Sequence, residues 1–276
     1  MYTRYFLYLQ TSGTQPRRIL HNSVRHHITR STSTTASARN SIPFYGLPRP
    51  EKVENDTPPL KRLVVAATSA VTALANPERA DAVAALGEVT GTISLQQMYD
   101  RMMQDATGQM ILRDKPKVDG ASINLDELVE TSGSGSFGEA YAKFMMQHGF
   151  DPEARSAVRY ISDPELMYVM LRYRQSHDFW HVLCDLPPTV LGELALKWVE
   201  LVQTGLPVAA LSATFGPLQL SADERYVLRA VYLPWALKVG QRAPFLMNVY
   251  YEELFQENLV DLRKRLMIEP APKVKS

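Results

Sequence analysis

The sequence predicts an all-α protein: a single, mainly helical domain that carries a two-helix metal site and follows a disordered targeting leader. Few stretches alternate between apolar and polar residues with period two, the pattern of a half-buried strand. Several segments instead begin at helix-capping residues and end at Gly or Pro. The composition of the 276 residues, 45% hydrophobic and 21% charged, is that of an ordinary globular protein.

Residues 1–42 have the composition of a mitochondrial targeting presequence. Residues 1–50 hold seven arginines and many Ser and Thr, and the first acidic residue is Glu51. The nearest candidate for a secretory signal, Tyr5 to Leu9, is shorter than the apolar run of about 7 to 15 residues that such a signal needs. A basic nucleic-acid-binding arm is the competing interpretation, but Lys is absent from this region. We expect the mature chain to begin between Ser31 and Pro43, and we expect no nucleic-acid partner.

Residues 43–59 contain five prolines and little hydrophobic periodicity, which predicts an extended linker or arm. Residues 60–276 form the predicted helical domain. Because residues 1–50 hold seven of the 30 basic residues, the chain after residue 50 carries 23 basic against 29 acidic residues. A first helix is predicted from Leu60 to Asn76. Its uncharged core of thirteen residues is shorter than the roughly 20 that span a bilayer, so we expect a buried helix.

The next helices are delimited by Gly, Pro and capping residues. Three are expected before residue 150: Glu78–Leu86, Leu95–Gln104 and Phe137–His148. Gly149 should stop the third, and Thr107–Pro116 is predicted to be a turn with a short continuation. Ser132–Gly138 is rich in Gly, but it lacks the preceding strand and the following Lys of a phosphate-binding loop, so we expect a flexible turn there.

The middle of the chain predicts two helices joined by a proline corner. Ser162 and Glu165 have the spacing of a capping box. Pro164 suits a first helical turn, because its missing N–H costs nothing there. Leu186–Pro188 interrupts this helix, and a second helix is expected over Pro187–Thr204.

The first of these two helices carries a polar stripe. At about 100° per residue, His181 lies roughly 40° around the helix from His177. Arg174 lies roughly 60° and Asp178 roughly 100° from the same reference. Eleven residues separate His181 from Glu193, enough to turn at the prolines and bring a second carboxylate back against the first helix. Imidazole and carboxylate donors together suit Zn²⁺, Fe²⁺ or Mn²⁺. The sequence therefore predicts, in outline, a two-helix site for a divalent metal.

Other interpretations of this stripe remain open. Histidines at i and i+4 also occur by chance on surfaces and in cores. Arg174 can orient Asp178 or grip a substrate anion, but at this spacing the two also form an ordinary ion pair. Cys184 is the only cysteine, which excludes an intramolecular disulfide and fits a reducing compartment. It lies three residues after His181, so it is either a metal ligand or, more commonly for a lone Cys, a small buried hydrophobe.

Downstream of this pair the pattern stays helical. The remaining predicted segments are a turn at Gly205–Pro207, a mostly apolar patch at Val208–Leu220, and helices at Ala222–Val239 and Ala243–Arg265. Ser221 and Glu224 form a second capping box, at the start of the helix Ala222–Val239. Pro234 lies within this helix and should kink it. The tail from Pro270 is expected to fray.

The motif formed by HDxxH, eleven residues and Glu, with the flanks RYRQSHDFWH, DPELMYVM, GQMILRDKP, FGEAYAKFM and VYLPWALKVG, resembles the ubiquinone biosynthesis protein 4 family. The resemblance extends roughly from Thr57 to Ile268, and only the Ser/Gly-rich run before Phe137 departs from it. It implies a mainly helical fold and a divalent metal, usually zinc. The implied ligands are His177, Asp178, His181 and Glu193.

The resemblance also implies a location and a reaction. The location is peripheral, on the matrix side of the mitochondrial inner membrane, within the multi-protein complex that builds ubiquinone, and we expect a homo-oligomer. The family is associated with removing the ring carboxylate of 4-hydroxy-3-methoxy-5-polyprenylbenzoate, which gives 2-methoxy-6-polyprenylphenol. An oxidative version leaves a hydroxyl group and favours iron over zinc, because zinc does not change its oxidation state.

The chemistry of decarboxylation assigns roles to some of these residues. A proton must reach the ring carbon that held the carboxylate, and a metal with an open position polarises an oxygen as a Lewis acid. Arg174 is a candidate for positioning the anion, and Glu193 is a candidate proton donor when it does not bind the metal. Four protein ligands on a tetrahedral zinc leave no open position. Substrate can therefore reach the metal only if the metal is five- or six-coordinate, or if one of the four protein ligands is labile.

Two other classes of function compete with this carboxy-lyase. One is a non-catalytic scaffold that binds polyprenyl lipids and organises the complex, with a structural metal. The other is a phosphohydrolase with His-Asp on a helix, which needs an upstream His and a distal Asp. His148 is available as the upstream His, and Asp223 or Asp261 as the distal Asp. Phosphohydrolases of this kind, however, space their ligands differently.

Overall fold

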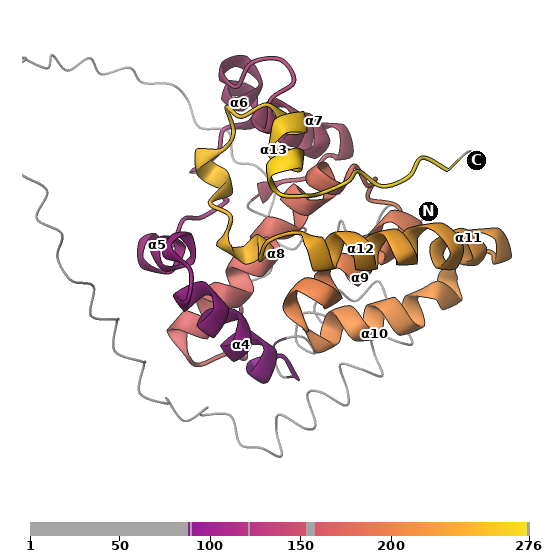
Figure 1. The fold of residues 1–276 in the computed structure, drawn as a ribbon. Helices are drawn as coiled ribbons and strands as arrows, with labels where there is room; N and C mark the ends of the chain where they lie inside the picture. Colours follow the sequence, from indigo (N-terminus) through magenta and orange to yellow (C-terminus); the bar gives the residue numbers. More distant parts are fainter. Residues whose placement is uncertain (1–87, 89, 121, 153–157, 275–276) are drawn as a thin grey trace, which may run out of the picture. The chain divides into compact units, whose positions relative to one another are not determined.

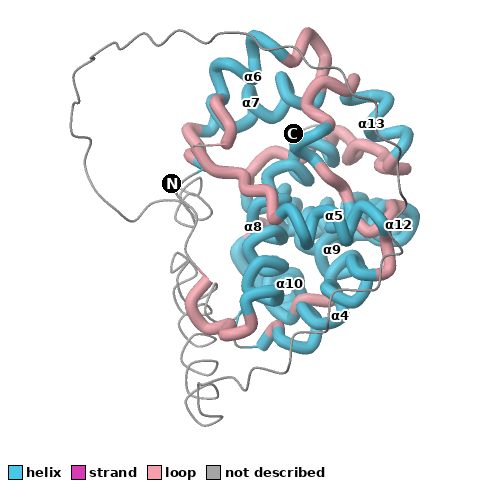
Figure 2. Tube along the Cα trace, turned by 90° about the vertical axis from the view of Figure 1, so that its left-hand side faces the viewer, coloured by secondary structure: helices cyan, strands magenta, loops and turns pink. Residues whose placement is uncertain are grey.

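The structure is a computed structural model that describes residues 88, 90–120, 122–152 and 158–274 (Figure 1). Within these residues helices alternate with loops and there is no strand (Figure 2), which confirms the all-α prediction. The leader, the arm and the predicted helices Leu60–Asn76 and Glu78–Leu86 lie outside the described residues. The division of the chain into leader, arm and helical domain stays a prediction.

Among the described residues, four helices precede the histidine-containing segment: α4 (Thr92–Met103), α5 (Ala106–Asp114), α6 (Leu125–Thr131) and α7 (Phe137–His148). α7 has the predicted bounds, and Gly149 ends it in the left-handed conformation, with φ 64°. The predicted turn at Thr107–Pro116 is wrong, because α5 occupies most of it. The Asp105 side chain caps α5 by accepting from the Gly108 N–H at 2.9 Å. Gly108 allows α5 to approach α4 closely, because a Cβ at this position would lie 2.3 Å from the Met102 carbonyl oxygen.

The predicted helix pair is present as α8 (Pro164–Cys184) and α9 (Val190–Thr204). The cap of α8 is Asp163, whose carboxylate accepts from the N–H groups of Glu165 and Leu166 at 2.8 and 3.2 Å. Asp163 thus takes the capping position that the sequence pattern had predicted for Ser162. Asp fills this position well, because its charge complements the positive end of the helix dipole.

α9 begins later than predicted. The two prolines lie in the corner, and the Thr189 hydroxyl caps the helix by accepting from the Gly192 N–H at 3.2 Å. Asp185, the residue that follows α8, has a left-handed φ of 56°. The Leu186 N–H donates to the His181 carbonyl at 3.0 Å. This is a Schellman-type ending, which reverses the chain into the corner.

The C-terminal half contains these elements: α10 (Pro207–Phe215), η2 (Gly216–Gln219), α11 (Ala222–Val227), the π-helical η3 (Leu228–Tyr232), α12 (Leu233–Arg242), η4 (Leu246–Asn248), η5 (Tyr251–Glu253) and α13 (Leu259–Arg265). The capping box of Ser221 and Glu224 is confirmed. The predicted helix Ala222–Val239 is interrupted by η3, and Pro234 follows directly. Proline has no N–H to donate to the preceding turn, and a wide π turn accommodates that loss.

The predicted helix Ala243–Arg265 is wrong over residues 243–258, and only its last part is present, as α13. The Leu246 N–H donates to the buried side chain of Gln203 at 2.9 Å, so a tertiary contact replaces a helical one. The prediction that the tail frays from Pro270 is also wrong for the described residues, which extend to Val274. The Ala271 N–H donates to the Cys184 carbonyl at 2.7 Å, which fixes this segment against the end of α8.

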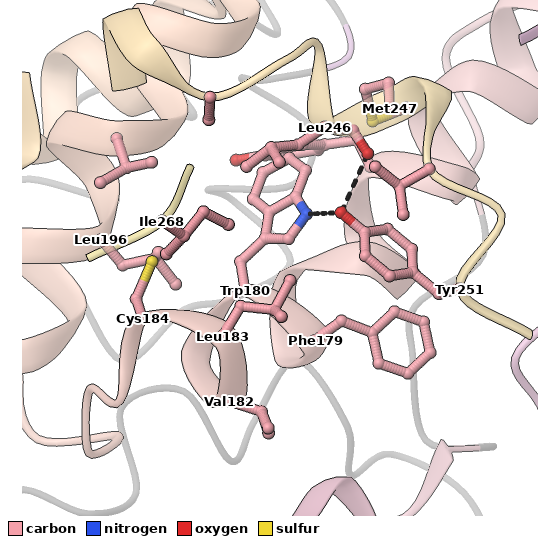
Figure 3. Packing of buried hydrophobic residues seen from close by; sticks show 14 of the residues in the cluster. Phe179, Trp180, Val182, Leu183, Cys184, Leu196, Leu246, Met247, Tyr251 and Ile268 are labelled. Carbon is pink, nitrogen blue, oxygen red and sulfur yellow. Dashed lines mark hydrogen bonds between the residues drawn. The ribbon is translucent and has the colours of Figure 1, made fainter. Parts of the chain in front are cut away.

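α8 is the helix around which α4, α5, α7 and α9 pack (Figure 1). One of its faces is apolar and contacts the segment of η4 and η5 (Figure 3). There the Trp180 Nε1–H donates to the Tyr251 hydroxyl at 2.8 Å, and that hydroxyl donates to the Leu246 carbonyl at 3.0 Å. These contacts fix the rotation of α8, and so they determine which way its polar stripe faces. None of the described helices combines the length and apolarity needed to cross a bilayer.

Candidate metal centre

Three predicted ligands converge between α8 and α9. His177 and His181 lie one turn apart on α8, and Glu193 lies in the first turn of α9. The two Nε2 atoms are 3.2 Å apart. Glu193 Oε1 lies 3.1 Å from His181 Nε2, and Glu193 Oε2 lies 3.4 Å from His177 Nε2. The predicted two-helix arrangement of these three side chains is therefore present.

The spacing of these donor atoms fits a metal ion. Metal–nitrogen bonds of about 2.0–2.1 Å in a tetrahedral site place neighbouring ligand atoms about 3.3 Å apart. In this group one ligand atom from each residue lies within 4.8 Å of the others, and the close pairs are 3.1 to 3.4 Å apart. Two neutral imidazoles and one carboxylate form a donor set known from catalytic zinc sites.

The outer ring nitrogens show how the two imidazoles are oriented. His177 Nδ1 lies 2.7 Å from Glu200 Oε1, and His181 Nδ1 lies 3.1 Å from the Leu186 carbonyl oxygen. A carboxylate and a carbonyl oxygen only accept hydrogen bonds, so each Nδ1 carries the proton. Each neutral ring then points the lone pair of Nε2 at the other ring. Two lone pairs at 3.2 Å repel each other unless a proton or a cation lies between them.

Glu193 supports the same interpretation. Its side chain is buried, and among the described residues its Oε2 has no hydrogen-bond partner. Burial favours the neutral acid, but His181 and His177 outweigh it and hold the pKa of the carboxyl far below its usual range. The group therefore stays anionic, which is the form in which a carboxylate binds a cation, and it is poorly suited to deliver a proton. A buried carboxylate oxygen without a partner is a place where a bound cation restores the lost solvation.

The local sequence explains how Glu193 reaches this position. Thr189 caps α9 and places Glu193 in the first turn, where the helix dipole favours a negative charge. Gly192 allows that turn to fold tightly, since a Cβ there would lie only 2.1 Å from the Pro187 carbonyl oxygen. The proline corner and the glycine therefore set the distance between the carboxylate and α8.

The other two predicted site residues lie on α8, outside this group of three. Asp178 is buried and is not among the described residues whose ligand atoms converge. Its role as a ligand stays a prediction. Arg174 Nη2 donates to Glu88 Oε1 at 2.7 Å. The other oxygen of Glu88 accepts from the N–H groups of Arg159 and Tyr160, so Arg174 is part of a contact that fixes that loop.

Sequence reasoning missed Glu200, Lys197 and Tyr173. Glu200 is fully buried and accepts from His177, from Lys197 Nζ at 2.7 Å and from the Tyr173 hydroxyl. A signal was present in the pattern of α9. Glu193, Lys197 and Glu200 are the only charged residues of α9, and they follow one another at i, i+4 and i+7, so they share one face. Tyr173 and His177 share a face of α8 in the same way.

The ionisation of this network follows from its charges. Burial raises the pKa of the Glu200 carboxyl, but the Lys197 ammonium and the His177 ring outweigh it and lower the pKa to about 2. Burial and Lys197 lower the pKa of His177, but the carboxylates of Glu193 and Glu200 prevail and raise it to about 9. Without a metal, a proton therefore takes the place between the two imidazoles.

His148 and Cys184 are not part of the metal group. His148 lines a cavity of 420 Å³ beside the first residues of α9. The ring of Phe144 lies between it and His181, with centroids 5.0 and 5.5 Å away. The phosphohydrolase interpretation needs His148 as a ligand, and among the described residues it does not join the group. Cys184 is buried beside Leu196 and Ile268 (Figure 3), as expected for a small hydrophobe.

Comparison with known proteins agrees with the motif. Residues 52–272 match the family described as Coenzyme Q (ubiquinone) biosynthesis protein Coq4. The chain belongs to this family. The Coq4 match includes all the residues of the candidate centre, and it confirms the family that the motif and its flanks had predicted.

Named relatives extend this result. The mitochondrial ubiquinone biosynthesis protein COQ4 homolog of Nematostella vectensis is 47% identical over 202 residues, 72% of this chain and 97% of the relative. That of Rattus norvegicus is 39% identical over 257 residues, 92% of this chain and 94% of the relative. That of Homo sapiens is 41% identical over 216 residues, covering 78% and 81%. These Coq4 relatives are named mitochondrial, which is the compartment that the leader predicts.

One solved structure shares the fold. A protein of Nostoc punctiforme PCC 73102, named for ubiquinone biosynthesis, matches with a TM-score of 0.59 and 20% identity, over 75% of this chain and 96% of that chain. At this identity the similarity supports the helical fold alone.

Proposed function

We propose that this protein is a metal-dependent carboxy-lyase of ubiquinone biosynthesis, which converts 4-hydroxy-3-methoxy-5-polyprenylbenzoate to 2-methoxy-6-polyprenylphenol. One observation carries the proposal: His177, His181 and Glu193 converge on one point and Glu193 Oε2 has no hydrogen-bond partner among the described residues. In the reaction the bond between the ring and the carboxylate breaks, carbon dioxide leaves, and a proton takes its place.

The number of converging ligands supports catalysis over a purely structural site. Structural zinc sites use four protein ligands, whereas catalytic sites use three and keep a position for substrate. Here three side chains converge, so the difficulty of a closed four-ligand zinc site arises only when Asp178 also binds. A divalent cation held by these three supplies Lewis acidity toward an oxygen of the substrate. We propose zinc as the metal, and iron if the reaction is oxidative.

The chain's own residues have separate tasks in this proposal. His177, His181 and Glu193 hold the cation, and the depressed pKa of Glu193 favours its role as a ligand over that of proton donor. Arg174 remains a candidate for positioning the substrate anion. For this it must share its guanidinium between Glu88 and the substrate, which is possible because guanidinium has five donors in a planar fork.

We also propose a peripheral location on the matrix side of the inner mitochondrial membrane, in a complex with other ubiquinone-synthesising proteins and as a homo-oligomer. The named mitochondrial relatives and the predicted leader support this. A further support is the segment from Leu206 to Leu220, which contains no charged residue. Within it Phe215 is 41% exposed and Leu218 is 77% exposed. Such side chains suit contact with lipid and with a polyprenyl tail.

Decarboxylation by the purified mature protein tests the function. We expect the zinc-loaded protein to release carbon dioxide from a short-tailed carboxylated precursor, and we expect His181→Ala and the metal-stripped protein to release none. Activity that survives in His181→Ala removes the proposed role of the metal. A folded, metal-loaded protein with no activity under either anaerobic or aerobic conditions favours the scaffold function instead.

A further inference from the structure

Glu200 lies between α8 and α9 with its charge fully compensated by neighbouring donors. Its side chain is 0% exposed. Oε1 faces His177 Nδ1 at 2.7 Å, and Oε2 accepts from Lys197 Nζ at 2.7 Å and from the Tyr173 hydroxyl. A buried carboxylate is stable only when it is paired and hydrogen-bonded, and these three donors meet that requirement. Glu200 is therefore a fixed, ionised acceptor.

We propose that Glu200 is the positioning residue of His177, and that Lys197 and Tyr173 hold Glu200 in place for this task. The inference rests on the metal site of the proposed function. By accepting the Nδ1–H of His177, Glu200 sets the tautomer in which Nε2 carries the lone pair. It also fixes the rotation of the ring, so that Nε2 faces Glu193 and His181. Outer partners of this kind commonly strengthen metal binding by about 10- to 100-fold.

The two histidines are oriented by different devices. His181 donates its Nδ1–H to the main-chain carbonyl of Leu186, which the end of α8 and the proline corner hold in place. His177 has a side-chain partner instead, and that partner comes from the opposite helix. Substitution can therefore remove the support of His177 while leaving the support of His181 intact.

The network also links the two helices that supply the ligands. Tyr173 and His177 come from α8, whereas Lys197 and Glu200 come from α9, and all four meet between the helices. Lys197 lies one turn after Glu193, so the same face of α9 carries a ligand, its neighbour and the positioning carboxylate. A shift of α9 along α8 would break these contacts together. The network thus fixes the register in which Glu193 meets the imidazoles.

Zinc affinity of the full mature protein tests this role, measured by competition with a chromophoric chelator. We expect Glu200→Ala to weaken zinc binding about 10- to 100-fold and Tyr173→Phe to weaken it less, because Tyr173 acts only through Glu200. The matched control is Thr204→Val. Thr204 is buried one turn later in α9, where its hydroxyl donates to the Glu200 carbonyl at 2.7 Å and accepts from the Leu206 N–H at 3.2 Å, so this variant loses buried hydrogen bonds but keeps the contacts of the Glu200 carboxylate.

Glu200→Ala removes the carboxylate that faces the buried Lys197 ammonium, so a second variant guards against a folding defect. The double substitution Lys197→Met with Glu200→Leu removes both charges and fills the space. It is expected to fold and to bind zinc about 10- to 100-fold more weakly than wild type. Zinc binding by both folded variants within threefold of wild type would overturn the inference.

A spectroscopic readout separates positioning from a general loss of structure. In zinc-loaded wild-type protein, long-range ¹H–¹⁵N spectra should show His177 with its proton on Nδ1. In zinc-loaded Glu200→Ala the Nδ1 proton of this ring loses its acceptor, so its resonance should shift and it should exchange faster with water, while the spectrum of His181 stays unchanged. An unchanged His177 spectrum in that variant contradicts the inference.

The same measurements distinguish this inference from the proposed function. The metal site itself is contradicted if wild-type protein binds no stoichiometric zinc, or if the His181→Ala variant binds zinc as tightly as wild-type protein does. Wild-type protein that binds zinc and loses it on His181→Ala, while the two Glu200 variants bind normally, contradicts only the role of Glu200.

Discussion

Two clusters of buried charge on α8, around Arg172 and around His177, differ in how their charges are balanced. Around Arg172, one guanidinium meets one carboxylate, Glu252, in a bidentate pair, and Nη2 also donates to the Val249 carbonyl at 3.0 Å. Around His177, two carboxylates, Glu193 and Glu200, face a single ammonium, that of Lys197. The first cluster is neutral. The second has an excess of one negative charge when both imidazoles are neutral.

This difference separates a structural cluster from a binding site. A buried ion pair that closes on itself needs nothing further, so it holds α8 to the segment after α12. A buried cluster with one negative charge too many is stable only with an added proton or cation. The Arg172 cluster therefore belongs to the scaffold, and the His177 cluster needs a ligand. Mutation of the Arg172 cluster should therefore lower stability without changing zinc binding, whereas the stability of the His177 cluster should depend on the bound metal.

The largest effect on stability is expected from Arg172→Met. The substitution leaves the Glu252 carboxylate, whose side chain is 16% exposed, without its partner. Breaking one side of such a pair costs about 3–5 kcal/mol, and we expect about 3 kcal/mol because Glu252 retains some contact with water. Urea unfolding measures the loss. Zinc stoichiometry of the folded fraction should stay at the wild-type value.

A double variant sharpens this prediction. Arg172→Met with Glu252→Leu removes both charges and should recover most of the lost stability, because an apolar pair of similar volume replaces the ion pair. No recovery in the double variant means that Arg172 acts through packing against Tyr251, whose ring centroid lies 5.6 Å away, more than through charge. A loss of zinc in either variant contradicts the separation of the two clusters.

Gly192→Ala is expected to affect both stability and the metal site. Its Cβ would lie 2.1 Å from the Pro187 carbonyl oxygen, so the first turn of α9 must move, at a cost of about 2 kcal/mol. Because Glu193 is the next residue, zinc affinity should also fall. The matched control is Gly240→Ala, where a Cβ would lie 2.8 Å from Val202 Cβ, at the contact of α12 with α9. That variant should lose stability and keep its zinc affinity.

The pH dependence of stability should reverse when metal is added. Without metal, the raised pKa of His177 contributes stability that is complete below about pH 6.5 and is lost as the pH rises through 9. The lowered pKa of Glu200 contributes stability that is present above about pH 4.5 and is lost as the pH falls toward 2. We therefore expect metal-free protein to lose on the order of 1 kcal/mol between pH 7 and 9.

With zinc in excess the trend between pH 7 and 9 should be the opposite. Zinc binds the neutral imidazole, so rising pH removes the competing proton and strengthens binding. Thermal unfolding with zinc and with a chelator, at several pH values, measures both trends. Parallel curves in the two conditions would show that zinc and the proton do not share the site. His181→Ala serves as the control, because its curves should coincide.

The sequence predicted the parts of this molecule that depend on local chemistry. The bounds of α7 follow from the Gly-rich turn before it and from Gly149, and the convergence of His177, His181 and Glu193 follows from helical periodicity and a proline corner. Glu200 was missed because its partner lies on another helix. Its spacing from Glu193 shows a shared face of α9, but not which residue of α8 that face meets.

The wrong predictions have a common physical cause. Residues 243–258 have a composition that suits a helix, but the Gln203 side chain binds the Leu246 N–H and diverts the chain. α5 was taken for a turn because Gly108 is usually a helix breaker, whereas here it permits a close approach of two helices. In both places tertiary contacts override local preference. The place of Asp178 is the least determined by pattern, since at roughly 100° from His177 it lies at the edge of the polar stripe.

The smallest effect is expected from Cys184→Ala, which decides between the two roles that its position leaves open. Cys184 lies one turn from His181 but is buried in the apolar cluster, and burial raises the pKa of its thiol to about 12. A thiol that stays protonated is a poor metal ligand and a poor nucleophile. We expect Cys184→Ala to lower the free energy of unfolding by about 1 kcal/mol, to keep zinc affinity and stoichiometry, and to keep decarboxylation. In folded wild-type protein a thiol reagent at pH 8 should react only as fast as the protein unfolds. Fast reaction, or zinc lost with the thiol, would place Cys184 in the metal cluster and change its balance of charge.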